Sequence, residues 1–155
     1  MPKLYMLIGV PGSGKSTWAM NQRWDISNTV FASTDKFVEQ YATGEGKTYN
    51  EVFESFMPEA INLMNQEVII ARKQGKDVVW DQTNITVKSR KKKFNMLPEY
   101  EAIAVVFDTP EWEVLDKRLK GRPGKVIPRR VVYQMIEHLQ VPTEAEGFKE
   151  IWFTS

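Results

Sequence analysis

The sequence predicts an α/β fold of three layers, with helices on both faces of a parallel sheet of about five strands. Short apolar runs alternate along the chain with segments in which apolar residues recur at helical spacing, and this alternation is typical of parallel sheets. A glycine-rich loop at residues 9–16 follows the first apolar run and opens a helix. Ligands of such folds bind at the carboxyl ends of the strands, so we expect the functional residues at that edge.

The expected strands are short and apolar. They cover residues 5–8, 29–33, 77–80 and 102–107, and a short fifth strand is expected at 150–153. Their carboxyl ends would bring together the 9–16 loop, Asp35, Asp81 and Asp108.

Helices are expected between these strands, at residues 16–20, 36–42, 49–74, 87–97, 111–120 and 129–140. A polar loop is expected at 43–47, after the second helix. Pro58 either divides the long 49–74 segment or lies in the first turn of its second part. Gly75 is expected to end that segment.

The composition is that of one ordinary globular domain. The chain has 155 residues, 42% of them hydrophobic, and a formal net charge of only +1. A nucleic-acid partner would therefore be attracted by local patches rather than by the whole surface. The chain contains no apolar run of about 18 residues, which predicts no membrane span. The absence of cysteine and of a signal-like start suits the cytoplasm, or a host's cytoplasm for a phage protein.

The loop Gly9-Val-Pro-Gly-Ser-Gly14-Lys15-Ser16 matches the P-loop pattern G-x-x-x-x-G-K-[ST] and so predicts a P-loop NTPase fold. Backbone N–H groups of a glycine-rich turn bind phosphate oxygens without interference from side chains. Lys15 would reach the β- and γ-phosphates of ATP, and the Ser16 hydroxyl would ligate Mg²⁺. The expected ATP-binding residues here are Gly9, Pro11, Gly12, Ser13, Gly14, Lys15, Ser16 and, as a weaker candidate for the α-phosphate, Thr17.

Asp35 follows the second expected strand and has two interpretations. Its carboxylate could accept the proton of an attacking hydroxyl in phosphoryl transfer. Alternatively, it could cap the helix that follows, because aspartate is a favourable N-cap residue.

Asp81 ends the third expected strand and begins the turn Asp81-Gln-Thr-Asn84. A carboxylate at this point can hold Mg²⁺ or its water, although a turn bonded to its own backbone is the alternative. No glutamate follows Asp81, which disfavours a motor-type ATPase. The Asn-Lys-x-Asp motif of GTPases is missing as well.

Two segments are strongly basic. Residues 117–130 contain seven Lys or Arg and no acid. Their glycines and prolines favour a mobile loop, in which Arg122 would stabilise transition-state charge; a solvated basic loop is the alternative. Residues 88–93 hold five basic residues, which are either a solvated helix surface or a contact to a phosphate backbone.

With these features in order, the chain resembles the small P-loop kinases related to the kinase domain of bacteriophage polynucleotide kinase. The resemblance runs from Lys3 to about Pro142. It is carried by the P-loop, by Asp35, by the Asp-x-Thr-Asn turn and by the segment Arg122-Pro-Gly-Lys-Val-Ile-Pro128.

The resemblance implies one kinase domain over residues 1–155, with a lid at about 117–130 and with ATP and Mg²⁺ as cofactors. Asp35 would be the general base, and Lys15, Arg122 and Arg118 would neutralise the phosphates. The implied substrate is a nucleic acid, DNA or RNA, with a 5′-hydroxyl as acceptor.

The acceptor side departs from this pattern. Where the phage-type kinases carry an arginine that grips the acceptor's phosphate, three residues after the base, this chain has Val38. Two other acceptors therefore stay open: the hydroxymethyl group of 5-hydroxymethyluracil in phage DNA, and a nucleoside or small metabolite. A non-catalytic nucleotide-binding module is a further alternative.

Overall fold

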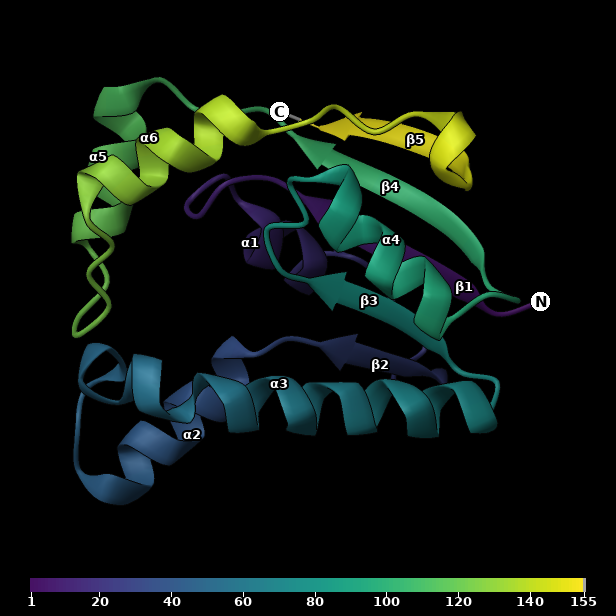
Figure 1. Ribbon diagram of the computed structural model, residues 1–155, viewed down its shortest axis with the longest axis horizontal. Helices are drawn as coiled ribbons and strands as arrows, with labels where there is room; N and C mark the ends of the chain where they lie inside the picture. The colour runs from purple at the N-terminus through teal and green to yellow at the C-terminus, as the bar shows by residue number, and fades with distance from the viewer. Residues whose placement is uncertain (155) are drawn as a thin grey trace.

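The computed structural model describes residues 1–154 and arranges them in three layers around one sheet (Figure 1). All strand pairs in this sheet are parallel, and the strand order is β2-β3-β1-β4-β5. The strands are β1 (Lys3–Ile8), β2 (Thr29–Ala32), β3 (Asp77–Asp81), β4 (Glu101–Phe107) and β5 (Phe148–Thr154). The predicted α/β fold with a five-strand parallel sheet is confirmed.

Helices cover both faces of the sheet. They are α1 (Lys15–Met20), α2 (Asp35–Glu45), α3 (Tyr49–Lys73), α4 (Val87–Met96), α5 (Trp112–Lys120) and α6 (Arg129–His138), with 3₁₀ turns at Ile26–Asn28 and Glu144–Glu146. Alternate residues of β1 point to opposite faces, as the period of a strand requires. Met6 packs in the core beneath α3, with Met64 and Val68. Leu7 packs on the other face, with Ala19 of α1.

The central strands are apolar along their whole length because both of their faces are covered. In β4, residues 102–107 are all buried. Helices α5 and α6 pack together beyond the carboxyl ends of the strands, where Leu115 and Val132 enclose Val10 (Figure 1). This packing places the basic segment, residues 117–130, next to the P-loop.

Helix α2 is longer than predicted. The polar residues 43–45 continue the helix instead of forming a loop. The helix ends at Gly46, whose φ of 67° is the left-handed conformation in which helices commonly end.

Helix α3 is continuous, so both expected positions of Pro58 are wrong. Thr48 and Glu51 form a capping box that fixes its start. Pro58 lies on the exposed side of the helix, while Val52, Ala60 and Met64 hold the helix against the core.

Strand β5 begins two residues before the predicted 150–153 range. Phe148 is buried and pairs with Ala102, with a register irregularity directly after this pair. That irregularity breaks the simple alternation on which the sequence prediction depends. Within residues 1–154, no helix is long and apolar enough to cross a membrane.

Candidate active site

The P-loop lies between β1 and α1, and at Gly9 it packs closely against its own Ser13 and against the end of β4. A side chain at position 9 would bring its Cβ to 2.6 Å from the Ser13 Oγ and 3.0 Å from the Phe107 Cβ. Gly14 has a φ of 100°, which non-glycine residues rarely adopt. The Gly9 N–H donates to the Thr83 carbonyl at 3.0 Å. The loop is therefore fixed to the turn that follows β3.

Lys15 is buried in the centre of this loop. Its ammonium donates to the carbonyls of Gly9 and Val10, both at 2.9 Å. Burial lowers the pKa of Lys15 to about 8, and the nearby charges of Asp81 and Asp35 only partly oppose that effect. A phosphate group at this nitrogen would restore the favourable environment for its positive charge.

Ser16 and Asp81 come together at the carboxyl ends of β1 and β3. The Ser16 hydroxyl donates to the Asp81 Oδ2 at 2.8 Å. Burial raises the pKa of Asp81, while this hydrogen bond and the charge of Lys15 act in the opposite direction. A hydroxyl and a carboxylate beside a phosphate-binding loop are groups that can hold Mg²⁺ in a P-loop nucleotide site.

Asp35 does not cap α2, so the N-cap alternative is wrong. The N-cap residue is Thr34, and its side chain makes no capping hydrogen bond. Instead, the Asp35 Oδ1 accepts a 2.6 Å hydrogen bond from the Tyr49 hydroxyl. The Asp35 Oδ2 lies 3.4 Å from the Lys125 ammonium. The carboxylate is thus directed towards α3 and the basic segment.

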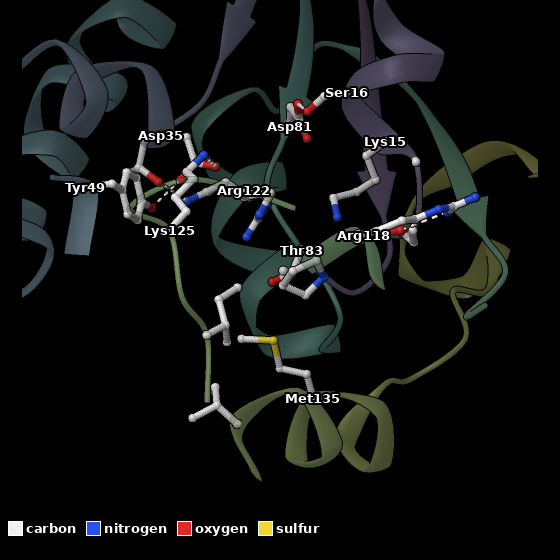
Figure 2. A pocket seen from close by; sticks show the side chains of 18 of the residues that line it. Lys15, Ser16, Asp35, Tyr49, Asp81, Thr83, Arg118, Arg122, Lys125 and Met135 are labelled. Atoms are coloured by element: carbon white, nitrogen blue, oxygen red, sulfur yellow. Dashed lines mark hydrogen bonds and ion pairs between the residues drawn. The ribbon is translucent and has the colours of Figure 1, made fainter. Parts of the chain in front are cut away.

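The basic segment forms the end of α5, a loop at 121–128 and the start of α6. The Arg118 guanidinium donates to the Gly12 carbonyl at 3.0 Å, so it contacts the P-loop itself. Figure 2 shows Arg122 pointing into the space between Lys15 and Asp35. Among the described residues, the Arg122 Nε and the Ser13 Oγ are buried polar atoms without a hydrogen-bond partner. Both atoms can donate a hydrogen bond, and both residues line the cavity beside the P-loop.

Asn50 docks the 121–128 loop onto α3. Its side chain donates to the Val126 carbonyl at 2.8 Å and accepts from the Val126 N–H at 2.7 Å. The Asn50 N–H also donates to the Gly124 carbonyl at 2.9 Å.

These residues line one cavity of about 1760 Å³ (Figure 2). Most ligand pockets hold about 300–1,000 Å³, so this cavity has room for a nucleotide and a second substrate. Its lining includes almost all of the predicted site residues, namely Pro11, Gly12, Ser13, Gly14, Lys15, Ser16, Thr17, Asp35, Asp81, Arg118 and Arg122. Gly9, the first residue of the P-loop, does not line the cavity.

Among the cavity residues that sequence reasoning did not single out are Tyr49, Phe53 and Lys125. Tyr49 and Phe53 lie one turn apart in α3, with ring centroids 5.4 Å apart, and they look like ordinary core positions in an amphipathic helix. Lys125 is one of the seven basic residues in 117–130, and nothing in the sequence distinguishes it from the other six. The Thr48-x-x-Glu51 signal could have placed Tyr49 in the first turn of α3.

The second basic segment, residues 88–93, is only partly solvated, because two of its five basic side chains are buried. Arg90 is completely buried and forms an ion pair with Glu146, with 2.8 Å between Nε and Oε1. It also donates to the Asn84 carbonyl at 2.9 Å. Lys93 is buried over the Trp80 ring. Lys88, Lys91 and Lys92 are the exposed members.

Asn84 connects Arg90 to the P-loop strand. Its side-chain amide donates to the Leu7 carbonyl at 2.7 Å. It also bonds the Gln82 carbonyl of its own turn at 3.3 Å, so the alternative of a self-bonded turn is correct for Asn84. Asp81, in contrast, bonds Ser16.

Comparisons with known proteins agree with this geometry. A family model described as an AAA domain (AAA_33) matches residues 4–142. Among solved structures, a chain of the Pnkp1/Rnl/Hen1 RNA repair complex is 29% identical with a TM-score of 0.70, over 90% of this chain and 44% of that chain. This chain therefore spans less than half of that RNA repair protein.

Two further solved structures share the fold at lower identity. A fungal RNA kinase is 13% identical with a TM-score of 0.61, over 99% of this chain and 74% of that chain. A gluconokinase from Sinorhizobium meliloti is 18% identical with a TM-score of 0.51, over 98% and 81%. The chain belongs to the AAA domain family AAA_33, and its fold and P-loop are those of a kinase-like P-loop phosphotransferase.

Proposed function

We propose that this chain is an ATP- and Mg²⁺-dependent kinase that transfers the γ-phosphate of ATP to a hydroxyl of a nucleic acid. One observation carries the proposal: Asp35, Arg122 and the P-loop residues Lys15 and Ser16 line the same cavity. A proton acceptor opposite a phosphate-binding loop is the arrangement that phosphoryl transfer to a hydroxyl requires. A non-catalytic nucleotide-binding module would not need Asp35 and Arg122 in one cavity.

The proposed roles follow from the contacts. Lys15 and the P-loop N–H groups would bind the phosphates, and Arg122 and Arg118 would neutralise charge on the transferred group. Ser16 and Asp81 would hold Mg²⁺, which supplies charge neutralisation between the β- and γ-phosphates. We propose residues 117–130 as the lid of this single domain.

The reaction would proceed by attack of the acceptor oxygen on the γ-phosphorus. The new P–O bond forms as the bond to the β–γ bridging oxygen breaks, and ADP leaves with that electron pair. The acceptor's proton passes to the Asp35 carboxylate.

The nucleic-acid acceptor is supported by the 29% identity to a chain of an RNA repair complex. A different acceptor is supported by Val38, which is completely buried and packs in the core with Ala42 and Val52. No cation projects from the position at which phage-type kinases hold the acceptor's phosphate. This observation favours a kinase of hydroxymethyluracil in DNA, or of a nucleoside or other small metabolite, as the second candidate.

Labelled ATP with a panel of acceptors separates these candidates. The panel contains a 5′-hydroxyl oligonucleotide, duplex DNA with internal hydroxymethyluracil and blocked ends, free nucleosides and gluconate. Label on the 5′-hydroxyl oligonucleotide is the expected result, and its affinity should fall as salt rises. Label in blocked-end DNA alone would overturn the 5′-hydroxyl assignment, and label in small molecules alone would overturn the nucleic-acid assignment.

Asp35→Ala tests the proposed base. Turnover should fall by about 10²–10⁴-fold, while ATP affinity changes little because the carboxylate's bonded partners, Tyr49 and Lys125, lie outside the P-loop. Near-normal turnover of this variant would show that Asp35 is not the base.

A further inference from the structure

We propose that Tyr49 is a positioning residue, whose hydroxyl fixes the Asp35 carboxylate so that one defined oxygen faces the acceptor. The inference rests on the proposed function, since it assigns a second residue to the base of that reaction. It concerns the two oxygens of Asp35, which have different neighbours.

The Oδ1 of Asp35 has the short contact. The Tyr49 hydroxyl donates to it at 2.6 Å, within the range of hydrogen bonds to ionised carboxylates. Tyr49 comes from the capped first turn of α3, which also holds the 121–128 loop through Asn50. Its ring is half-buried and lies against Phe53. The Tyr49 hydroxyl is therefore held in place by the capped start of α3 and by the packing of its ring against Phe53.

The Oδ2 of Asp35 has a longer and shared contact. The Lys125 ammonium lies 3.4 Å from it but only 2.6 Å from the Glu39 Oε1. Lys125 can thus stay paired with Glu39 when another group approaches Asp35. We assign Oδ2 as the oxygen that receives the acceptor's proton.

The raised pKa of Tyr49 keeps its hydroxyl protonated, and so a donor, at neutral pH. Burial raises its pKa, and the hydrogen bond to Asp35 and the negative charge there raise it further. The phenol therefore does not compete for the proton that Asp35 accepts. Tyr49 lines the cavity (Figure 2), but its effect on the reaction passes through Asp35.

Tyr49→Phe tests this role because it removes one oxygen and keeps the ring against Phe53 and Lys125. With an acceptor that the wild type labels, kcat should fall by about tenfold, the lower end for loss of a hydrogen bond to a charged group. The KM for ATP should stay the same. Tyr41→Phe is the matched control, since Tyr41 is exposed and stacks on Phe56 outside the cavity.

The double variant Asp35→Ala/Tyr49→Phe separates positioning from an independent role. If Tyr49 acts through Asp35, the double variant should turn over at the rate of Asp35→Ala alone. An equal loss in both backgrounds, or a normal kcat for Tyr49→Phe, would overturn the inference. Normal turnover of Asp35→Ala would instead contradict the proposed function on which the inference rests.

A spectroscopic readout tests the contact without any acceptor. The ¹³C carboxyl resonance of Asp35, assigned by its loss in Asp35→Asn, should differ between the wild type and Tyr49→Phe. Tyr41→Phe should leave it in place. The same resonance in all three proteins would overturn the inference, and thermal unfolding checks that each variant is folded.

Discussion

Ser16 at the start of α1 and Asp81 at the end of β3 are joined by a 2.8 Å hydrogen bond from the serine hydroxyl to the carboxylate. Asp81 is the last residue of β3, and Ser16 follows the loop after the neighbouring strand β1. The two strands pair in parallel with Leu7 opposite Asp81, so their carboxyl ends lie side by side. The carboxylate is therefore placed by strand register, while the serine is placed by the P-loop.

The Asp81→Asn variant should weaken Mg²⁺ binding. The amide can still accept from Ser16, but the negative charge is lost, and about tenfold more Mg²⁺ should be needed to promote ATP binding. Asp77→Asn is a matched control at the opposite end of β3, where Asp77 accepts from the Lys3 N–H. A Mg²⁺ titration of the binding of a fluorescent ATP analogue measures both. Equal Mg²⁺ requirements in the two variants would contradict the proposed metal role.

The affinity for ATP should depend on pH through Lys15. Its pKa is lowered to about 8 by burial, so the ligand-free protein loses this charge as pH rises through that value. Phosphate oxygens favour the charged form, so ATP binding must take up a proton above pH 8. Affinity should then fall about tenfold per pH unit.

Calorimetric titrations between about pH 7.5 and about pH 9.5 measure this dependence and the proton uptake. Lys15→Met should bind more weakly and lack this pH dependence. Binding by the wild type with no proton uptake would contradict this prediction, because Lys15 would then carry the same charge before and after ATP binds.

The Asn50→Ala variant should loosen the 121–128 loop. It removes two hydrogen bonds to the Val126 backbone, at about 1 kcal/mol each. Hydrogen exchange at the Val126 amide should become about 5- to 30-fold faster. Asn62→Ala is the control, because Asn62 is exposed on the same helix. Unchanged exchange at Val126 would mean that other contacts hold the loop.

Loss of Arg90 should destabilise the whole domain. Arg90→Met leaves the nearly buried Glu146 carboxylate without its partner, which typically costs about 3–5 kcal/mol of the free energy of unfolding. Lys91→Met, an exposed change on the same helix, should alter it by less than about 0.5 kcal/mol. Urea denaturation compares the two, and coincident curves would show that the ion pair does not stabilise the fold.

The sequence predicted the fold because its main signals are local. Buried strands such as residues 102–107 are apolar throughout, and the P-loop has a fixed length between a strand and a helix. The prediction was wrong at Pro58, where a local preference against helix competes with the packing of the rest of the domain. Pro58 is unfavourable within a helix, but burial of Val52 and Ala60 on the opposite side keeps α3 continuous.

The candidate site was only partly predictable, for a different reason. Lys15 and Ser16 belong to one motif, whereas the partners of Asp35 are 14 and 90 residues away in the chain. Such contacts depend on how α2, α3 and the 121–128 loop pack. Arg90 shows the same limit, since a run of basic residues indicates solvent exposure unless the acid that pairs with one of them is known.

The strand order has a consequence for how the chain folds. β1 is synthesised before both of its neighbours, and Leu4 must wait for Val78 on one side and Ala102 on the other. Pairings so distant in sequence form slowly, and an apolar strand without partners is prone to aggregate. The loop of Lys15 is anchored to Thr83, so its ATP-binding conformation depends on a turn that is synthesised after β3. Nucleotide would thus give no help to a nascent chain that ends before this turn.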